Sequence, residues 1–205
     1  MHHEPTGGPA VEPTAEPTDA KRRLLAVATE LFSWRGYDGV GTQEIVGSAG
    51  LTKPTLYHHF GTKAGLLEAV CRRTHAELLR RLRPCLDYHG DLPRTLEQTV
   101  AALLRFAEAS PDELRLFIAL MQAPPGSDGR RIVDPYREEL EASIRSMFAA
   151  AAKQHGNMIG REAPYTASFL GTVFAYCVML MDGRVGLEAD LAHRVAHQFG
   201  HGIYS

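Results

Sequence analysis

The sequence predicts an all-helical protein with about nine helices. Apolar residues recur every three or four positions in one segment after another, as they do in helices that bury one face. Capping residues and glycines stand at the ends of these segments, and no alternating strand pattern of useful length is present. A chain of 205 residues with 44% apolar and 22% charged side chains can bury one large core or two small ones.

The first 18 residues differ from the rest of the chain. They contain four prolines and only one sizeable aliphatic side chain, Val11. Such a segment has too little apolar area to offset the entropy lost on ordering it. We therefore expect residues 1–18 to form a disordered, acidic, proline-rich tail.

Charge is distributed unevenly along the chain. Residues 20–86 contain 11 Lys or Arg and 5 Asp or Glu, a local charge of +6 within a chain of net charge −2. Because electrostatic attraction acts over about a Debye length, a basic segment favours a polyanion partner for that segment alone.

Four helices are expected in the first part of the chain. The apolar spacing predicts helices over 19–36, 42–50 and 52–60, followed by a long helix that ends near Pro84. The two short helices each begin at a threonine that can act as an N-cap, and the first two helices end at glycines.

The remaining helices have similar start and stop signals. A fifth helix follows Asp91, and a capping box beginning Ser110-Pro111 opens a sixth. Residues 124–129 have the composition of a loop. The last three helices are expected from Asp134-Pro135 to near Gly156, over 164–181 and over 187–203.

Several classes of protein find no support in the sequence. The most apolar run, residues 169–181, is 13 residues long, whereas a membrane span needs about 20. The first residues lack the features of a signal peptide, so we expect a cytoplasmic protein. Three cysteines without a C-x-x-C pair support neither a disulfide framework nor a zinc site. No common catalytic signature is present, so we expect no enzymatic activity, no cofactor and no bound metal.

Residues 42–60 carry the most informative pattern. Two short helices meet at Gly50, where the small Ala49 permits close packing and Leu51 lies between them, as a helix-turn-helix requires. In the second helix, Leu56 and Phe60 face inward. The outward groups suit phosphate oxygens, base edges and thymine methyl groups, and they comprise Lys53, Thr55, Tyr57, His58 and His59.

The segment from Leu24 to Val70 resembles the DNA-binding domain of TetR-family transcriptional regulators. The matching stretches are 31–38, Gly41-Thr42 with Ile45, 49–53, 55–63 and 66–67. The resemblance implies a three-helix, homeodomain-like DNA-binding domain over 19–65 and a helical domain for effector binding and dimerisation over 66–205. Val46 and Gly47 depart from the family pattern and bear on the packing and rigidity of the motif.

The resemblance also implies which residues contact double-stranded DNA. Thr42 and Lys63 are expected on phosphates at the starts of two helices, and the others lie along the recognition helix. The expected contacts are Thr42, Thr52, Lys53, Pro54, Thr55, Tyr57, His58 and Lys63.

A homodimer is expected from the last two helices. The apolar run at 169–181 has no polar face, as in a helix that is covered on one side by its own core and on the other by a partner. Small residues beside it permit close approach of a second helix, which suggests a four-helix bundle across the interface. The candidate interface residues are Ala167, Leu170, Gly171, Phe174, Ala175, Val178, Leu191, Val195 and Phe199. The alternative is a monomer in which these residues are simply core.

Aromatic and sulfur-containing side chains are candidates for an effector pocket, because methionine adapts to irregular apolar molecules. The candidates are Leu103, Phe106, Phe117, Met121, Tyr136, Phe148, Tyr176 and Met179, with plain core packing as the alternative. His193, His197 and His201 recur every four residues and could share a metal, but a solvated or interface row is favoured because no carboxylate or thiolate stands at a matching spacing.

The resemblance thus implies a ligand-responsive regulator that binds a palindromic operator as a homodimer. We expect a repressor that is released by a small, mostly apolar effector. The alternatives are an activator of the same fold and, less favoured, a helical enzyme or a protein-interaction adaptor.

Overall fold

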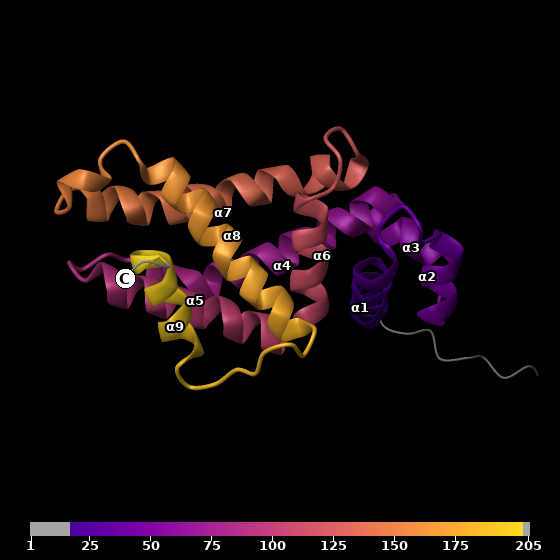
Figure 1. Ribbon diagram of the computed structural model, residues 1–205. Helices are drawn as coiled ribbons and strands as arrows, with labels where there is room; N and C mark the ends of the chain where they lie inside the picture. Colours follow the sequence, from indigo (N-terminus) through magenta and orange to yellow (C-terminus); the bar gives the residue numbers. More distant parts are fainter. Residues whose placement is uncertain (1–16, 203–205) are drawn as a thin grey trace, which may run out of the picture.

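The computed structural model describes residues 17–202, and within that range it contains nine α-helices, one short 3-10 helix and no strand (Figure 1). The predicted all-helical class is confirmed. Most of the expected acidic tail, residues 1–16, lies outside the described residues, whereas residues 17 and 18 already belong to the first helix.

Three helices form one end of the molecule, which we call the head, and a long fourth helix leads away from it. The fully buried side chains of Leu24, Phe32, Ile45 and Leu56 make up the centre of the head. The helices are α1 (Pro17–Arg35), α2 (Thr42–Ser48), α3 (Lys53–Phe60) and α4 (Lys63–Leu86).

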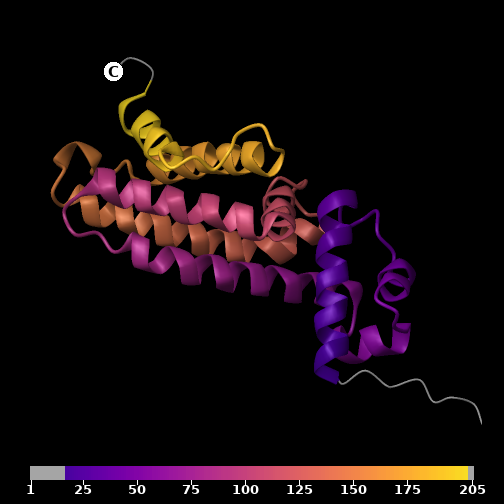
Figure 2. The ribbon, with the colours of Figure 1, turned by 90° about the horizontal axis from the view of Figure 1, so that it is seen from below.

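The rest of the chain, which together with α4 we call the body, is built in layers (Figure 2). Helices α5 and α7 pack on α4 on one side and under α8 and α9 on the other, while α6 packs on α1 and so joins the body to the head. The further elements are α5 (Leu92–Ala109), α6 (Pro111–Met121), α7 (Asp128–Ala152), the 3-10 helix η1 (Gly156–Met158), α8 (Glu162–Met181) and α9 (Leu191–His201).

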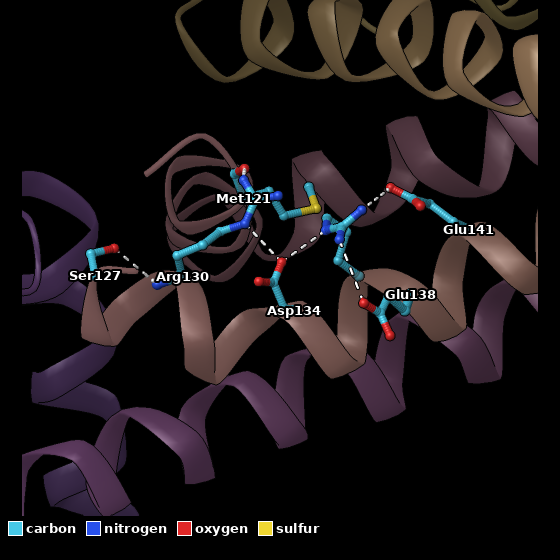
Figure 3. A network of polar contacts seen from close by, with 7 residues as sticks. Met121, Ser127, Arg130, Asp134, Glu138 and Glu141 are labelled. Atoms are coloured by element: carbon cyan, nitrogen blue, oxygen red, sulfur yellow. Dashed lines mark hydrogen bonds and ion pairs between the residues drawn. The ribbon is translucent and has the colours of Figure 1, made fainter. Parts of the chain in front are cut away.

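Helix α7 begins earlier than the sequence pattern predicts. It starts at Asp128 rather than at Asp134-Pro135, because the hydroxyl of Ser127 caps it by accepting a hydrogen bond from the backbone N–H of Arg130 at 3.3 Å. The Asp134 carboxylate accepts hydrogen bonds from Nε of Arg130 at 2.7 Å and Nε of Arg137 at 3.0 Å (Figure 3). These side-chain bonds help the helix to continue through Pro135, which has no N–H to donate.

Other boundaries differ by a few residues. Helix α4 continues past Pro84 to Leu86, and α9 begins at Leu191 instead of 187. The expected capping box before α6 does not form, since Ser110 makes no side-chain cap. Glu113 pairs instead with Arg73 of α4, at 3.4 Å.

Candidate nucleic-acid interface

Helices α2 and α3 are joined by a tight turn centred on Gly50. Gly50 has φ +61°, in the left-handed region that glycine adopts without strain. The backbone N–H of Leu51 donates to the carbonyl of Val46 at 2.8 Å, which closes the turn. A Cβ on Gly50 would lie 2.8 Å from a guanidinium nitrogen of Arg23. Both the backbone conformation and the available space therefore favour glycine at this position.

Two arginines of α1 hold the turn and α2 in place. Arg23 donates a hydrogen bond to the carbonyl of Ala49 at the end of α2, and Arg35 pairs with Glu44 in the first turn of α2. The sequence pattern gives Arg23 no role, because its partner is 26 residues away and no local spacing indicates the contact.

Helix α3 has one anchored side and one open side. Leu56 is fully buried and Phe60 is half-buried against the core of the head, so the orientation of the helix about its own axis is fixed. The opposite side is exposed to solvent, and 45% of Tyr57 is accessible. The exposed residues of this helix are Lys53, Pro54, Tyr57 and His58.

The expected threonine contacts differ in their surroundings. The hydroxyls of Thr52 and Thr55 are hydrogen-bonded to each other at 3.0 Å, and Thr55 is half-buried. Thr42 is the first residue of α2, and Gly41 takes the N-cap position that the sequence pattern assigns to Thr42. The structure thus places all three at helix starts, and their contacts with DNA stay predictions.

Lys63 makes contacts inside the head. It is the first residue of α4, and its ammonium donates to the carbonyl of Tyr37 at 2.6 Å while lying 4.2 Å from the centroid of the Tyr37 ring. Partial burial lowers the pKa of the Lys63 ammonium from its ordinary value. In this conformation Lys63 connects the start of α4 to the loop between α1 and α2. A DNA phosphate would therefore have to share the Lys63 ammonium with the Tyr37 carbonyl.

Arg115 connects the head to the far end of α8. Its guanidinium carbon lies 4.9 Å from the centroid of the Trp34 ring at the end of α1. The same guanidinium donates to the Asp182 carboxylate at 2.9 Å and to the carbonyl of Met181 at 3.3 Å. Arg115 itself belongs to α6, so a single side chain joins α1, α6 and the C-terminal end of α8.

The expected dimer face is divided by the structure into an outward and an inward part. Ala167, Gly171 and Ala175 are exposed along one side of α8, with Phe174 and Val178 half-buried beside them. The other candidates face the core of the same chain: Leu170, Leu191 and Val195 are buried, and Phe199 packs against Phe148 and Phe169. Leu191 and Val195 have almost no exposed area in the single chain, at 2% and 0%, so the outward part of α8 is the better candidate for the interface.

The expected pocket residues lie in different surroundings within the body. Leu103, Phe106, Phe117 and Met121 are buried in the continuous core. Phe117 and Tyr136 pack against the imidazole of His75, with ring centroids 6.4 and 5.2 Å away. Tyr176 donates to the side chain of Gln198, and Met179 is half-buried. Phe148 alone of the eight lines a cavity of about 480 Å³ that opens between α5, α7, α8 and α9.

The histidines of α9 form a row on its surface. His193 lies 3.0 Å from a carboxylate oxygen of Glu97 on α5, and the rings of His197 and His201 are stacked with centroids 4.1 Å apart. The sequence spacing did not indicate the Glu97 carboxylate. Among residues 17–202, no group of three or more His, Cys, Asp or Glu side chains is arranged to hold a metal ion.

Replacing Arg115 by alanine should loosen the attachment of the head. The change removes the cation over Trp34 and the hydrogen bonds to Asp182 and Met181, so we expect unfolding free energy to fall by about 2 kcal/mol. Trp34 is the single tryptophan of the sequence, so its fluorescence reports on the junction directly. Acrylamide quenching of Trp34 should increase, and it should not increase in Arg145→Ala, which removes an exposed arginine of α7. Unchanged quenching in Arg115→Ala would contradict this role.

Comparison with known proteins assigns the head to a family. Residues 24–70 match the family model described as bacterial regulatory proteins, tetR family. The transcriptional activator FasR of Mycolicibacterium smegmatis is 38% identical over 101 residues, which cover 49% of this chain and 46% of FasR. The nucleoid occlusion factor SlmA of Escherichia coli is 26% identical over 170 residues, which cover 80% of this chain and 83% of SlmA. The match to FasR thus spans less than half of that protein.

The fold comparison extends over the body as well. The crystal structure of AibR in complex with isovaleryl coenzyme A and operator DNA has a TM-score of 0.67 to this structure at 21% identity. The alignment covers 88% of this chain and 96% of AibR, so the arrangement of head and body is shared. The family match falls on the residues that build the turn and α3. The head therefore matches the helix-turn-helix DNA-binding domain of the tetR family of bacterial regulatory proteins, and head and body together share the fold of AibR.

Proposed function

We propose that this protein is a ligand-responsive transcriptional repressor that binds a palindromic operator as a homodimer. The observation that carries the proposal is the geometry of α3. Its buried side is anchored by Leu56, and its open side presents Lys53, Tyr57 and His58 from a TetR-family head. A cation, a phenol and an imidazole on one exposed helix face can contact phosphates and base edges in a major groove.

The outward side of α8 supports dimerisation. By length and composition α8 could cross a membrane, but one side of it packs on α5, α6, α7 and α9. Its other side exposes Ala167, Gly171 and Ala175, and a Cβ added at Gly171 would meet no atom within 4 Å in the described chain. Small side chains let two helix axes approach closely, so a second copy of α8 is a suitable occupant of this face.

The dimer accounts for the form of the DNA site. Two heads related by a two-fold axis contact two half-sites that are related by the same symmetry, one or more helical turns apart. The protein would therefore act in the cytoplasm, where a bacterial chromosome lies, on an inverted repeat.

Ligand response is supported by the relatives. AibR was crystallised with both isovaleryl coenzyme A and operator DNA. In this chain, a small, mostly apolar effector that favours one spacing of the heads would change operator affinity by the difference in its affinities for the two arrangements. Repression requires only that the operator be occupied, so it needs no surface beyond α3 and the dimer face.

An activator is the second candidate, because FasR, which shares 38% identity over 101 residues, is named an activator. Selection of genomic fragments by the purified protein, followed by sequencing, tests both forms of the proposal. We expect a small set of inverted repeats, and absence of any preferred site would overturn both. A reporter behind the selected promoter then decides between them, since a repressor lowers its expression and an activator raises it.

Replacing Tyr57 by alanine should weaken operator binding without unfolding the head. A direct base contact contributes about 1–3 kcal/mol, so we expect a loss of roughly 10- to 100-fold in affinity. The melting temperature should stay unchanged because 45% of Tyr57 is exposed. Ile159→Ala, which removes another exposed apolar side chain far from the head, is the control. Unchanged operator affinity in Tyr57→Ala would exclude this residue from the DNA.

Lys63→Met separates the two roles of Lys63 because it keeps the aliphatic stem and removes the ammonium. Loss of the hydrogen bond to the Tyr37 carbonyl should reduce unfolding free energy by about 1.5 kcal/mol, measured by urea denaturation. If Lys63 also contacts phosphate, the slope of log affinity against log salt concentration should fall by about one charge. A loss of stability with an unchanged slope would limit Lys63 to its bond within the head.

Gly171→Leu should separate the two subunits. The open space around Gly171 lets one chain accept the leucine, whereas two closely packed α8 helices cannot. We expect monomers in sedimentation velocity, helical content close to wild type, and operator affinity reduced more than tenfold. Ala149→Leu, at an exposed position of α7, is the matched control. A stable dimer in Gly171→Leu would rule out this face of α8 as the interface.

A further inference from the structure

The cavity between α5, α7, α8 and α9 has an aromatic wall. Its volume of about 480 Å³ falls in the range of small-molecule sites. Phe148, Tyr165 and Phe199 line it, and the ring of Phe148 lies 5.9 Å from that of Tyr165 and 6.1 Å from that of Phe199. Phe169 packs behind them, 5.2 Å from Phe199. Rings held in this way offer both faces and edges to another ring.

The polar groups of the cavity are uncharged. Asn157, Ser168, Thr172 and Gln198 line it together with apolar residues, and among residues 17–202 no Asp, Glu, Lys, Arg or His belongs to its lining. The side-chain oxygen of Gln198 accepts a hydrogen bond from the Tyr176 hydroxyl at 2.7 Å, which fixes the amide and leaves its NH2 group to donate. Amide and hydroxyl groups at the edge of an aromatic surface orient a ligand without requiring it to carry charge.

We propose that this cavity binds a neutral, ring-containing small molecule with hydrogen-bonding substituents, and that this molecule is the effector. The inference rests on the proposed function and specifies its ligand. A carboxylate or phosphate placed against these walls would lose part of its hydration and would find no cation among the described lining residues, which is costly. The site thus differs in chemistry from one that would enclose the phosphates of a coenzyme A thioester.

A more basic cleft does exist elsewhere in the body, but its charges are partly compensated. Arg80, Arg81 and Arg105 line a cleft between α4 and α5. Glu77 accepts hydrogen bonds from Nε of Arg80 and Nε of Arg81, each at 2.7 Å. That cleft also lacks an aromatic wall, so it is a poorer site for an effector with an extended apolar part.

The position of the cavity connects it to the proposed dimer face. Thr172 and Ser168 lie on α8 beside the exposed row of small residues, and Gln198 and Phe199 lie on α9. A ligand between these helices therefore touches the helix that would pair with the second subunit. The C-terminal end of the same helix is bonded to Arg115, which contacts the head.

Two dyes with the same ring system test the chemistry of the site on the full-length chain. N-phenyl-1-naphthylamine is neutral, and 1-anilinonaphthalene-8-sulfonate adds one sulfonate to the same rings. We expect the neutral dye to bind once per chain with a rise in fluorescence, and the sulfonate to bind at least tenfold more weakly. Equal or tighter binding of the sulfonate, or no saturable binding of the neutral dye, would overturn the proposal.

Variants locate the bound dye. Thr172→Leu fills the cavity from α8 and should lower affinity for the neutral dye at least tenfold, and Gln198→Leu removes the amide from α9 and should lower it several-fold. Ser146→Leu, which fills a separate cavity between α4 and α7, should leave dye affinity unchanged. If Thr172→Leu fails to fold, Gln198→Leu and Ser146→Leu decide the outcome. Unchanged affinity in Gln198→Leu, or an equal loss in Ser146→Leu, would place the dye elsewhere and overturn the site.

Operator binding in the same preparations separates this inference from the proposed function. Binding of the neutral dye that changes operator affinity supports both. If the operator is bound but no dye binds, the inference fails and the proposed regulator stands. If the dye binds at the site but no operator is found, the ligand site stands and the proposed regulator fails. Dye binding that leaves operator affinity unchanged overturns the assignment of the cavity as the effector site.

Discussion

Arg23 reaches from α1 to the carbonyl of Ala49, and this hydrogen bond acts together with the positive φ of Gly50 to fix the angle between α2 and α3. Burial of Leu56 then fixes the orientation of α3 about its own axis. Once both are fixed, the side that carries Tyr57 can face only outward. Contacts with base edges require such rigidity, because a hydrogen bond weakens steeply with small changes in distance and angle. The proposed function therefore depends on the turn at Gly50, although the proposed base contacts all come from α3.

Local signals predicted the head well, and contacts between distant residues account for most of what they missed. The glycine turn and the caps act over a few residues, so the helix-turn-helix could be predicted from its spacing. The apolar repeat of α9 also indicated a helix, although it begins four residues later than expected, but a repeat does not say which neighbour its apolar side will meet. The structure turns Leu191 and Val195 toward the core of their own chain. Likewise no spacing could join Arg115 to Trp34, or Glu97 to His193, because these pairs come from different helices.

The fold also changes the prediction that the basic segment 20–86 as a whole attracts a polyanion. The net charge of +6 over residues 20–86 includes the arginines of α4, a helix of 24 residues and therefore about 36 Å long. Arg80, Arg81 and Arg83 stand 17 to 20 residues after its first residue, roughly 25–30 Å along the helix and therefore about three Debye lengths from the head. Residues 19–65 alone carry six basic and four acidic side chains. Attraction of the head to DNA thus relies less on total charge than on a few well-placed cations. The proposed phosphate contact of Lys63 is therefore important, and so is its observed hydrogen bond to the Tyr37 carbonyl.

The proposed ligand response depends on where the walls of the cavity lead. A ligand shifts an equilibrium only by the difference between its affinities for the two states, and typical couplings amount to about 1–3 kcal/mol. A cavity enclosed by a single rigid element would bind its ligand equally in both states and would transmit nothing. Here the walls come from α5, α7, α8 and α9. Helix α8 ends at the Arg115 junction, whereas α9 packs mainly on α5. A ligand that sets the distance between α8 and α9 therefore acts on the helix connected to the head while its other contacts remain with the body. This difference in attachment gives a bound molecule a physical route to the spacing of the two recognition helices.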